Sequence, residues 1–188
     1  MYKSRFTLIE LLTVIAIIAV LVGLLFPALS GAQKKAKKTT ANTEIQSLKG
    51  AIQQYETTYG VLPAVCSADS GDTYVNADTT TSDAYKKLIK LLQNADPPNA
   101  NARGIEFLQI KNNTPGEFKD PWQEDYQVCI DNGSSEGYDG KLSDSSLEDG
   151  SLPSGVPDPI YASAAIWSTG DDSTFDNDKD PKSWDSSN

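Results

Sequence analysis

The sequence contains no histidine. Histidine is the commonest general base near neutral pH and the commonest transition-metal ligand, so a Ser-His-Asp triad, a Cys-His pair and a histidine-ligated metal are excluded. The chain has two cysteines, Cys66 and Cys129, which cannot complete a four-ligand zinc site alone. Two alternatives remain for them. They form a disulfide, which would stabilise an extracytoplasmic domain by about 4 kcal/mol, or they are two buried thiols.

Apolar residues are scarce outside one region. Hydrophobic side chains make up 38% of the 188 residues, and many of them lie in the first 30. The rest of the chain therefore folds around a small core and carries long surface loops. The net charge of −10 is uneven, because residues 39–188 contain ten basic and 25 acidic residues. Such a domain repels nucleic acid and attracts cations or basic protein surfaces, so we expect no nucleic-acid partner.

One long apolar run lies near the start of the chain. Residues 11–33 carry no charge over 23 positions, and about 20 apolar residues span a bilayer as a helix. The run is too long for the core of a cleaved secretory signal, and it continues into more helical sequence. A short basic leader, residues 1–5, precedes it. Residues 34–38 follow it with four lysines, and on charge alone the positive-inside rule favours that end as the cytoplasmic one.

The apolar spacing changes after residue 40. Five apolar residues recur at intervals of 3, 4, 3 and 4, which places one stripe on one face of an amphipathic helix: Ile45, Leu48, Ile52, Tyr55 and Tyr59. Gly60 and Pro63 are typical of a helix end. We therefore expect a helix from Phe6 to Tyr59 whose second half packs against a globular head.

The head is predicted to be mixed in structure. A short helix is expected at residues 84–92, with Ser82 or Asp83 as its N-cap. Strands are expected at residues 105–110, 126–130 and 160–167. The remaining segments, residues 64–82 and 131–159, are rich in polar turn residues and are expected to be loops, and residues 168–188 form a polar, acidic tail.

Glu10 is a carboxylate next to the apolar run. A charge at membrane depth costs about 2.5–3.5 kcal/mol on insertion scales, so it needs an explanation. One alternative is that Glu10 reaches water at the interface. The other is that it pairs with an amine created by cleavage before Phe6, four residues away on the same helix face. If that amine belongs to a neighbouring copy, the pair sets the axial register of packed helices.

The first family motif is residues 6–21, FTLIELLTVIAIIAVL. It resembles the N-terminal signature of type IV pilins and type II secretion pseudopilins. The resemblance implies that a prepilin peptidase cleaves after Arg5, that Phe6 becomes the methylated N-terminus, and that Glu10 is the family's glutamate. Arg5 departs from the pattern, which has glycine before the cut because glycine offers least hindrance. An uncleaved membrane protein is therefore the alternative.

The second motif is residues 120–126, DPWQEDY. It resembles the Asp-Pro-Trp-Gly-x-x-Tyr segment of major pseudopilins, with Gln123 in place of the glycine. Asp120 and Pro121 favour a turn, and Trp122 can close the edge of a core. The alternative is an ordinary aromatic-pinned turn before a strand.

The third motif is residues 167–180, WSTGDDSTFDNDKD. It resembles a Ser-x-Gly-x-Asp loop that binds calcium in major pseudopilins, and Ca²⁺ prefers six to eight oxygen ligands. The resemblance implies a calcium site drawn from Ser168, Asp171, Asp172, Asp176, Asp178 and Asp180. An EF-hand is rejected because Pro181 and Ser187 replace its required glycine and glutamate. The alternative is a solvated acidic tail.

Together the motifs imply a structural subunit of a type II secretion pseudopilus rather than an enzyme. The implied fold is α+β and pilin-like: a long N-terminal helix, transmembrane in its first half, packed on a small antiparallel sheet with long loops. The implied organisation is a leader at 1–5, a transmembrane assembly helix at 6–33, an amphipathic stem at 34–62 and a periplasmic head at 63–188. The implied location is the bacterial inner membrane, as a single-pass protein, and then the periplasmic filament. The implied partners are copies of itself, minor pseudopilins, the inner-membrane assembly platform, the prepilin peptidase and membrane lipid.

Two other functions remain open on the sequence. A surface type IV pilin for adhesion, motility or DNA uptake shares the first motif, but its usual disulfide-bounded C-terminal loop does not fit cysteines at 66 and 129. A membrane-anchored periplasmic enzyme or binding module is the other. Asp171 and Asp172 are acids of the type glycosidases use, although adjacent residues rarely face each other across a substrate.

Overall fold

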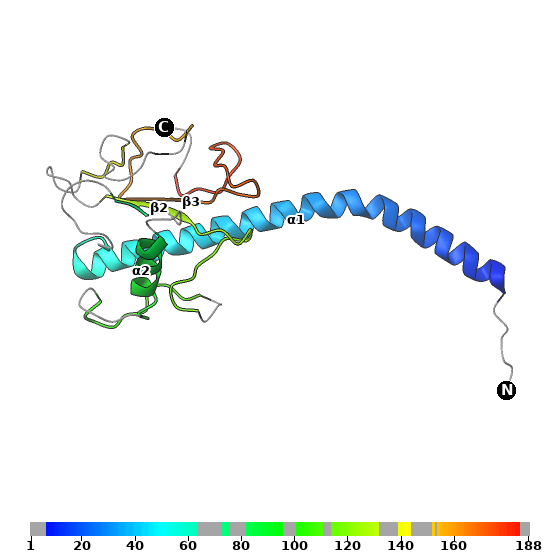
Figure 1. Cartoon of the computed structure of the whole chain (residues 1–188), viewed down its shortest axis with the longest axis horizontal. Helices are drawn as coiled ribbons and strands as arrows, with labels where there is room; N and C mark the ends of the chain where they lie inside the picture. Colours follow the sequence, from blue (N-terminus) through cyan, green and yellow to red (C-terminus); the bar gives the residue numbers. More distant parts are fainter. Residues whose placement is uncertain are drawn as a thin grey trace. The chain divides into compact units, whose positions relative to one another are not determined.

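The computed structural model of the chain describes residues 7–63, 73–75, 82–95, 101–110, 114–131, 139–143, 152 and 154–184. The chain divides into two compact units, residues 1–37 and residues 38–188. Helix α1, Leu8–Tyr59, contributes residues to both (Figure 1). The second unit also contains helix α2 (Ser82–Leu92) and three strands, β1 (Thr73–Val75), β2 (Gln127–Ile130) and β3 (Ala164–Trp167).

The first unit presents an apolar helix. Between Leu8 and Leu24 the large apolar side chains of α1 are 45–88% exposed. Among the described residues, no single helix is both long and apolar enough to cross a membrane, whereas Leu8–Leu24 and Leu29–Tyr59 pass on length and composition when taken together as a bent pair. The predicted helix start at Phe6 lies outside the described residues.

The second half of α1 carries the predicted stripe. Ile45, Leu48 and Ile52 are fully buried, and Tyr55 is 3% exposed. Tyr59 is only partly buried, and its hydroxyl donates a hydrogen bond to Oδ1 of Asn101 at 2.7 Å. The 3,4 spacing thus places the stripe against the head as predicted.

The helix also ends where the sequence predicts. Gly60 has φ +75°, and its N–H donates to the carbonyl of Glu56 at 2.7 Å. A left-handed residue just after the last turn is a common way to satisfy terminal carbonyls, and glycine adopts that conformation without steric cost.

Helix α2 begins two residues before the predicted start and ends at the predicted residue, Leu92. The prediction of a strand at residues 105–110 is wrong. The N–H groups of Phe107 and Leu108 both donate to the carbonyl of Leu92, at 2.8 and 3.0 Å. This backbone therefore caps the C-terminus of α2 and does not enter a sheet.

The sheet is antiparallel, in the order β1-β2-β3. Strand β1 lies within residues 64–82, which were predicted to be a loop, so that prediction is wrong at these three positions. The predicted strands at 126–130 and 160–167 are confirmed in part as β2 and β3. Ile160 pairs instead with Leu142, each donating an N–H to the other's carbonyl, and the chain bends before β3 begins at Ala164.

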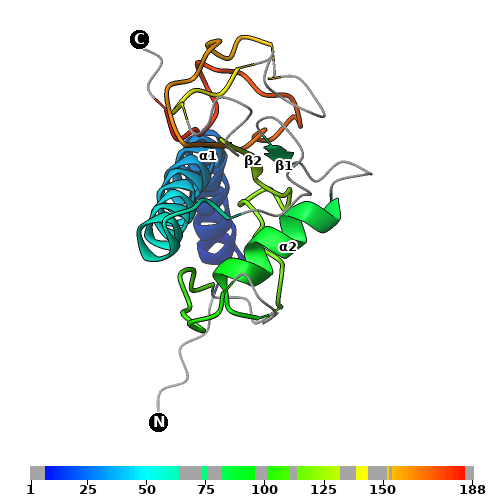
Figure 2. The same ribbon diagram turned by 90° about the vertical axis from the view of Figure 1, so that its left-hand side faces the viewer.

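The two faces of the sheet cover different cores. Alternate side chains point to opposite faces of a strand, and on β2 Val128 and Ile130 join the core formed with α1 and α2. Cys129, between them, joins a second core with Trp167 and Phe175. Figure 2 shows the resulting layers within this unit, with α2 on one side of the strands and the C-terminal segment on the other.

Candidate functional site

The first candidate site is the start of α1. The Oε2 atom of Glu10 accepts hydrogen bonds from the N–H of Thr7 at 2.8 Å and from its hydroxyl at 2.7 Å. In return, the Glu10 N–H donates to the Thr7 hydroxyl oxygen at 3.3 Å. This reciprocal arrangement is a capping box, which satisfies orphan donors at a helix N-terminus. The carboxylate therefore stabilises the helix start within its own chain.

This contact was missed in the sequence analysis, although the signal Thr-x-x-Glu before an apolar run is present at residues 7–10. The predicted cleavage site, Arg5 and Phe6, lies outside the described residues. Pairing between Glu10 and a Phe6 amine therefore stays a prediction. Glu10 itself is exposed and accessible to a partner.

The second candidate site is the turn at Asp120. This residue is 1% exposed, and its Oδ1 atom accepts hydrogen bonds from the N–H groups of Trp122 and Glu124, both at 2.9 Å. Its Oδ2 atom accepts the hydroxyl of Ser168 at 2.6 Å. Asp120 thus holds its own turn and joins it to residue 168, which connects the second and third family motifs. Trp122 is only half-buried, so it does not fill a core.

Gln123 occupies the position where the resembling motif has glycine. Its φ is +77°, a left-handed conformation in which an L side chain is strained. The backbone needs this conformation because the Gln123 N–H donates to the Asp120 carbonyl at 3.0 Å, and the Asp120 N–H donates to the Glu124 carbonyl at 2.8 Å. The geometry explains why a glycine suits this position.

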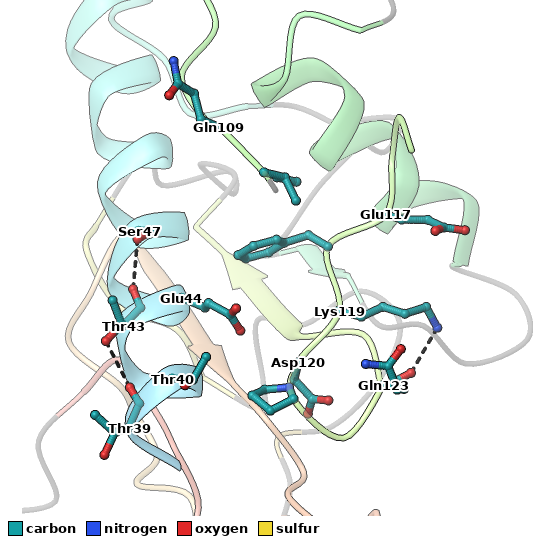
Figure 3. Close-up of a pocket in the computed structure, with 13 residues that line it drawn as sticks. Thr39, Thr40, Thr43, Glu44, Ser47, Gln109, Glu117, Lys119, Asp120 and Gln123 are labelled. Atoms are coloured by element: carbon teal, nitrogen blue, oxygen red, sulfur yellow. Dashed lines mark hydrogen bonds between the residues drawn. The ribbon is translucent and has the colours of Figure 1, made fainter. Parts of the chain in front are cut away.

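The same turn borders a hollow of about 600 Å³. In Figure 3 one wall is the face of α1 from Thr39 to Ser47, and the other is the segment from Glu117 to Gln123. Phe118 and Ile110 add apolar surface. The hydroxyls of Thr43 and Ser47 donate to carbonyls one helical turn earlier, at 3.0 and 2.9 Å.

The ionisable side chains around this hollow make contacts within the head. Glu44 accepts the hydroxyl of Tyr126 at 2.6 Å, and burial together with Glu44 raises the pKa of Tyr126. Lys119 donates to the carbonyl of Gln123 and lies 4.0 Å from Asp125. The ionisable groups named here therefore hold the fold.

The third candidate site is the C-terminal segment, which packs against the sheet. Rings of Trp167, Phe175 and Trp184 lie 5.6–6.0 Å apart, centre to centre. Lys38 and Lys49 of α1 donate to the carbonyls of Lys179 and Ser183, at 2.8 and 3.0 Å. The alternative of a solvated, unstructured tail therefore fails for the described part of this segment, residues 168–184.

Residues 171–180, the aspartate loop, contain the five aspartates of the predicted calcium set, and its sixth member, Ser168, precedes the loop. Asp176 pairs with Lys179 at 2.5 Å, which lowers the pKa of Asp176. The Asp176 N–H donates to Oδ2 of Asp180 at 2.7 Å. Burial raises the pKa of Asp180, and the charges of Asp172 and Asp176 add to the rise while Lys38 opposes it.

The loop meets one requirement of a calcium site and not another. Its donors are oxygens, as Ca²⁺ prefers. Within the described residues, however, no three acidic, cysteine or histidine side chains are grouped closely enough to hold a metal ion. Ser168 directs its hydroxyl to Asp120 and accepts the N–H of Gly170 at 3.1 Å. The calcium set therefore stays a prediction.

Of the two cysteines, Cys129 lies within the described residues. Cys129 is fully buried on β2, between Val128 and Ile130. Cys66 lies outside the described residues, so the predicted disulfide stays a prediction.

Comparison with known proteins decides the family. The chain is 31% identical to "Type II secretion system core protein G" of Pectobacterium carotovorum subsp. carotovorum over 162 residues, covering 85% of this chain and 84% of that protein. The chain belongs to the type II secretion system core protein G family. The pseudopilin is also 30% identical to the Vibrio cholerae serotype O1 protein of that name over 126 residues (66% and 69% covered) and 30% identical to the Escherichia coli K12 protein over 142 residues (73% and 79%). No protein-family model matches the pseudopilin, and no solved structure matches it significantly.

The family assignment confirms the predicted membership of the pseudopilin class. It also agrees with the observed architecture, a long N-terminal helix followed by a small antiparallel sheet, so the α+β, pilin-like fold prediction is confirmed. The alignments do not bear on the individual roles of Glu10, Phe6 or the aspartates.

Proposed function

We propose that this pseudopilin is a non-catalytic structural subunit that assembles through its N-terminal helix into the periplasmic filament of a type II secretion system. The observation that carries the proposal is the exposed apolar surface of α1 between Leu8 and Leu24, in a chain of this family. A helix that is apolar on all sides is stable in lipid or among other apolar helices. Before assembly it anchors the subunit in the inner membrane as a single pass, and in the filament it packs against copies of itself.

In this proposal Glu10 sets the register between neighbouring helices. Cleavage after Arg5 creates an amine at Phe6, and the Phe6 amine of a neighbouring copy then competes with Thr7 for the Glu10 carboxylate. The Thr7 donors are neutral, whereas the amine carries a full positive charge, so in a dry helix interface the added attraction between opposite charges favours the exchange. Pairing residue 6 of one helix with residue 10 of the next offsets them by about 6 Å, at 1.5 Å per residue.

The partners follow from this role. The subunit is a substrate of the prepilin peptidase, and it contacts other copies, minor pseudopilins and the inner-membrane platform during assembly. We also propose that the aspartate loop binds calcium, with Asp171, Asp172, Asp176, Asp178 and Asp180 as the available carboxylates. Support for calcium comes from the donors, because five carboxylates within ten residues supply the oxygen ligands that Ca²⁺ prefers.

The N-terminus of the protein purified from its native envelope tests the proposal. We expect a peptide mass that begins at Phe6 and carries one extra methyl group. A chain that begins at Met1 would lack the amine, and a monomeric membrane-anchored role would replace the filament.

A variant separates the charge of Glu10 from its capping role. Glu10→Gln keeps a carbonyl oxygen for the Thr7 hydrogen bonds but removes the charge, so we expect normal membrane insertion and a filament yield at least tenfold lower. The matched control is Glu124→Gln, at an exposed glutamate of the head, which should assemble normally. Normal filaments from Glu10→Gln would contradict the register mechanism.

A further inference from the structure

Helix α2 carries a basic surface that the proposed function does not use. Lys86, Lys87 and Lys90, the lysine face, follow one another at helical spacing, and the first two are exposed. The opposite side of the helix is fully buried, through Tyr85, Leu88, Ile89 and Leu92. Among the described residues of α2 from Ala84 onward, every side chain that is not apolar is a lysine. This concentration is unusual in a head where acidic residues outnumber basic ones.

The aspartate loop is the opposite kind of surface. Its ten residues hold five aspartates and one lysine. Asp172 and Asp178 are exposed, while Phe175 buries its ring against Trp167 and Trp184 and so fixes the loop to the sheet. Even with a calcium ion bound, five aspartates and one lysine leave the loop net negative.

Strand geometry keeps these two surfaces apart in one molecule. Val128, Ile130 and Ile166 point to the core that α2 covers, whereas Cys129, Ala165 and Trp167 point to the core that Phe175 covers. The lysine face and the aspartate loop therefore lie on opposite sides of the three-stranded sheet. Figures 1 and 2 agree, because α2 and the C-terminal segment flank the strands in both views.

We propose that the lysine face of one copy binds the aspartate loop of a second copy. The inference rests on the proposed function and adds a contact between heads to the packing of the N-terminal helices. The two surfaces are complementary in charge, and a twofold contact through either surface would bring like charges together. A contact between different surfaces is heterologous, and a heterologous contact that does not close into a ring generates an open helical filament. The charge pattern of the head thus favours the same type of assembly as the N-terminal helix.

Because the contact is electrostatic and solvent-exposed, it gives specificity and orientation, and it weakens with salt. An anionic membrane surface is the other acidic partner that exposed lysines attract. The aspartate loop is the better match, since each copy in a filament brings one loop for each lysine face. The membrane is retained as an outcome of the test.

A zero-length carbodiimide cross-linker tests the contact on assembled filaments of the full chain. The reagent joins an amine directly to a carboxylate, so we expect cross-linked peptides that connect Lys86 or Lys87 to Asp172 or Asp178. Mixed filaments of ¹⁴N- and ¹⁵N-labelled subunits show whether the link joins two copies, because half of such peptides in an equal mixture then carry mixed isotopes. Filaments that give no such peptide, or only links within one copy, would overturn the proposal.

Charge variants give the second measurement. Lys86→Glu with Lys87→Glu should lower the filament yield at least fivefold at low salt, whereas Lys86→Arg with Lys87→Arg should keep the yield but remove the cross-link, because arginine has no reactive amine. Lys141→Glu is the control for a charge reversal elsewhere on the head, at a half-exposed lysine of another surface, and should assemble normally. Unchanged filaments from the double glutamate variant would refute the contact.

The outcomes separate this inference from the proposed function. If wild type forms filaments and Glu10→Gln does not, the helix-based assembly stands whatever the lysine variants do. If the double glutamate variant instead loses binding to vesicles of anionic lipid while filaments keep their yield, the lysine face serves the membrane and the head contact is wrong. If wild type itself forms no filament, the proposed function fails first.

Discussion

Replacing Gln123 by glycine is expected to stabilise the head by about 0.5–1 kcal/mol. A non-glycine residue in the left-handed region costs about 1–2 kcal/mol, and Gln123 is held there at φ +77°. Glycine loses more conformational entropy than glutamine on folding, which offsets about 0.5–1 kcal/mol of the stabilisation gained by relieving that strain. The Gln123 N–H donates to the Asp120 carbonyl, and the Gln123 carbonyl accepts from Lys119. Both hydrogen bonds are made by the backbone, so glycine keeps them.

Thermal unfolding of the full chain in detergent, followed by near-ultraviolet circular dichroism of the aromatic side chains of the head, measures the effect. For a domain of this size about 1 kcal/mol corresponds to 2–4 °C, so we expect the Tm to rise by about 1–4 °C. Gln123→Ala keeps a Cβ atom and should change the Tm by less than the glycine variant. Asn94→Gly is the matched contrast at φ +55°, because that side chain donates to Gly104 and accepts from Asn101. It should lower the Tm. A lower Tm for Gln123→Gly, or an equal rise for alanine, would refute the assignment of strain to this residue.

Two further changes follow from the carboxylates of the head. Asp120→Ala should destabilise the head by about 3–5 kcal/mol, because two N–H groups and the Ser168 hydroxyl lose a buried acceptor. Asp120→Asn should lower the free energy of unfolding in urea by less than half of that amount. An equal decrease for the two variants would contradict the role of these hydrogen bonds. The raised pKa of Asp180 means that its ionised form disfavours the fold, so its contribution to stability falls as pH rises above the unfolded-state pKa. Asp180→Asn should therefore raise the Tm at pH 7 in the presence of a chelator, and the difference in Tm from wild type should vanish below about pH 3.9. Millimolar calcium should raise the Tm of this variant less than that of wild type. A wild-type Tm that does not rise with calcium would exclude the ion.

Local pattern was enough for the helical part of the molecule. The stripe from Ile45 to Tyr55, the end at Gly60 and the short helix up to Leu92 were all predicted, because each depends on neighbours within one or two turns. The family resemblance could also be recognised from the sequence, since the signature at residues 6–21 is one continuous stretch. The capping box at Thr7 and Glu10 is equally local, and the Thr-x-x-Glu spacing that signals it is present at residues 7–10.

The strands and the sites depended on distant partners. Residues 105–110 have the composition of a strand, but two of their N–H groups donate to the last carbonyl of α2. Strand β1 forms in a segment of loop-like composition because it pairs with β2. Asp120 and Ser168 are 48 positions apart in the chain, and no periodicity connects them.

By itself, then, the sequence determined the family, the long helix with its apolar first half and buried stripe, and the uneven distribution of charge. Only the tertiary structure decided where those charges stand: the alternation of β2 and β3 sends the lysine face and the aspartate loop to opposite sides of one sheet. The physical reason is range. Helical periodicity depends on residues that are neighbours along the chain. Contacts between segments that meet only on folding decide how strands pair and which face of the sheet each side chain occupies.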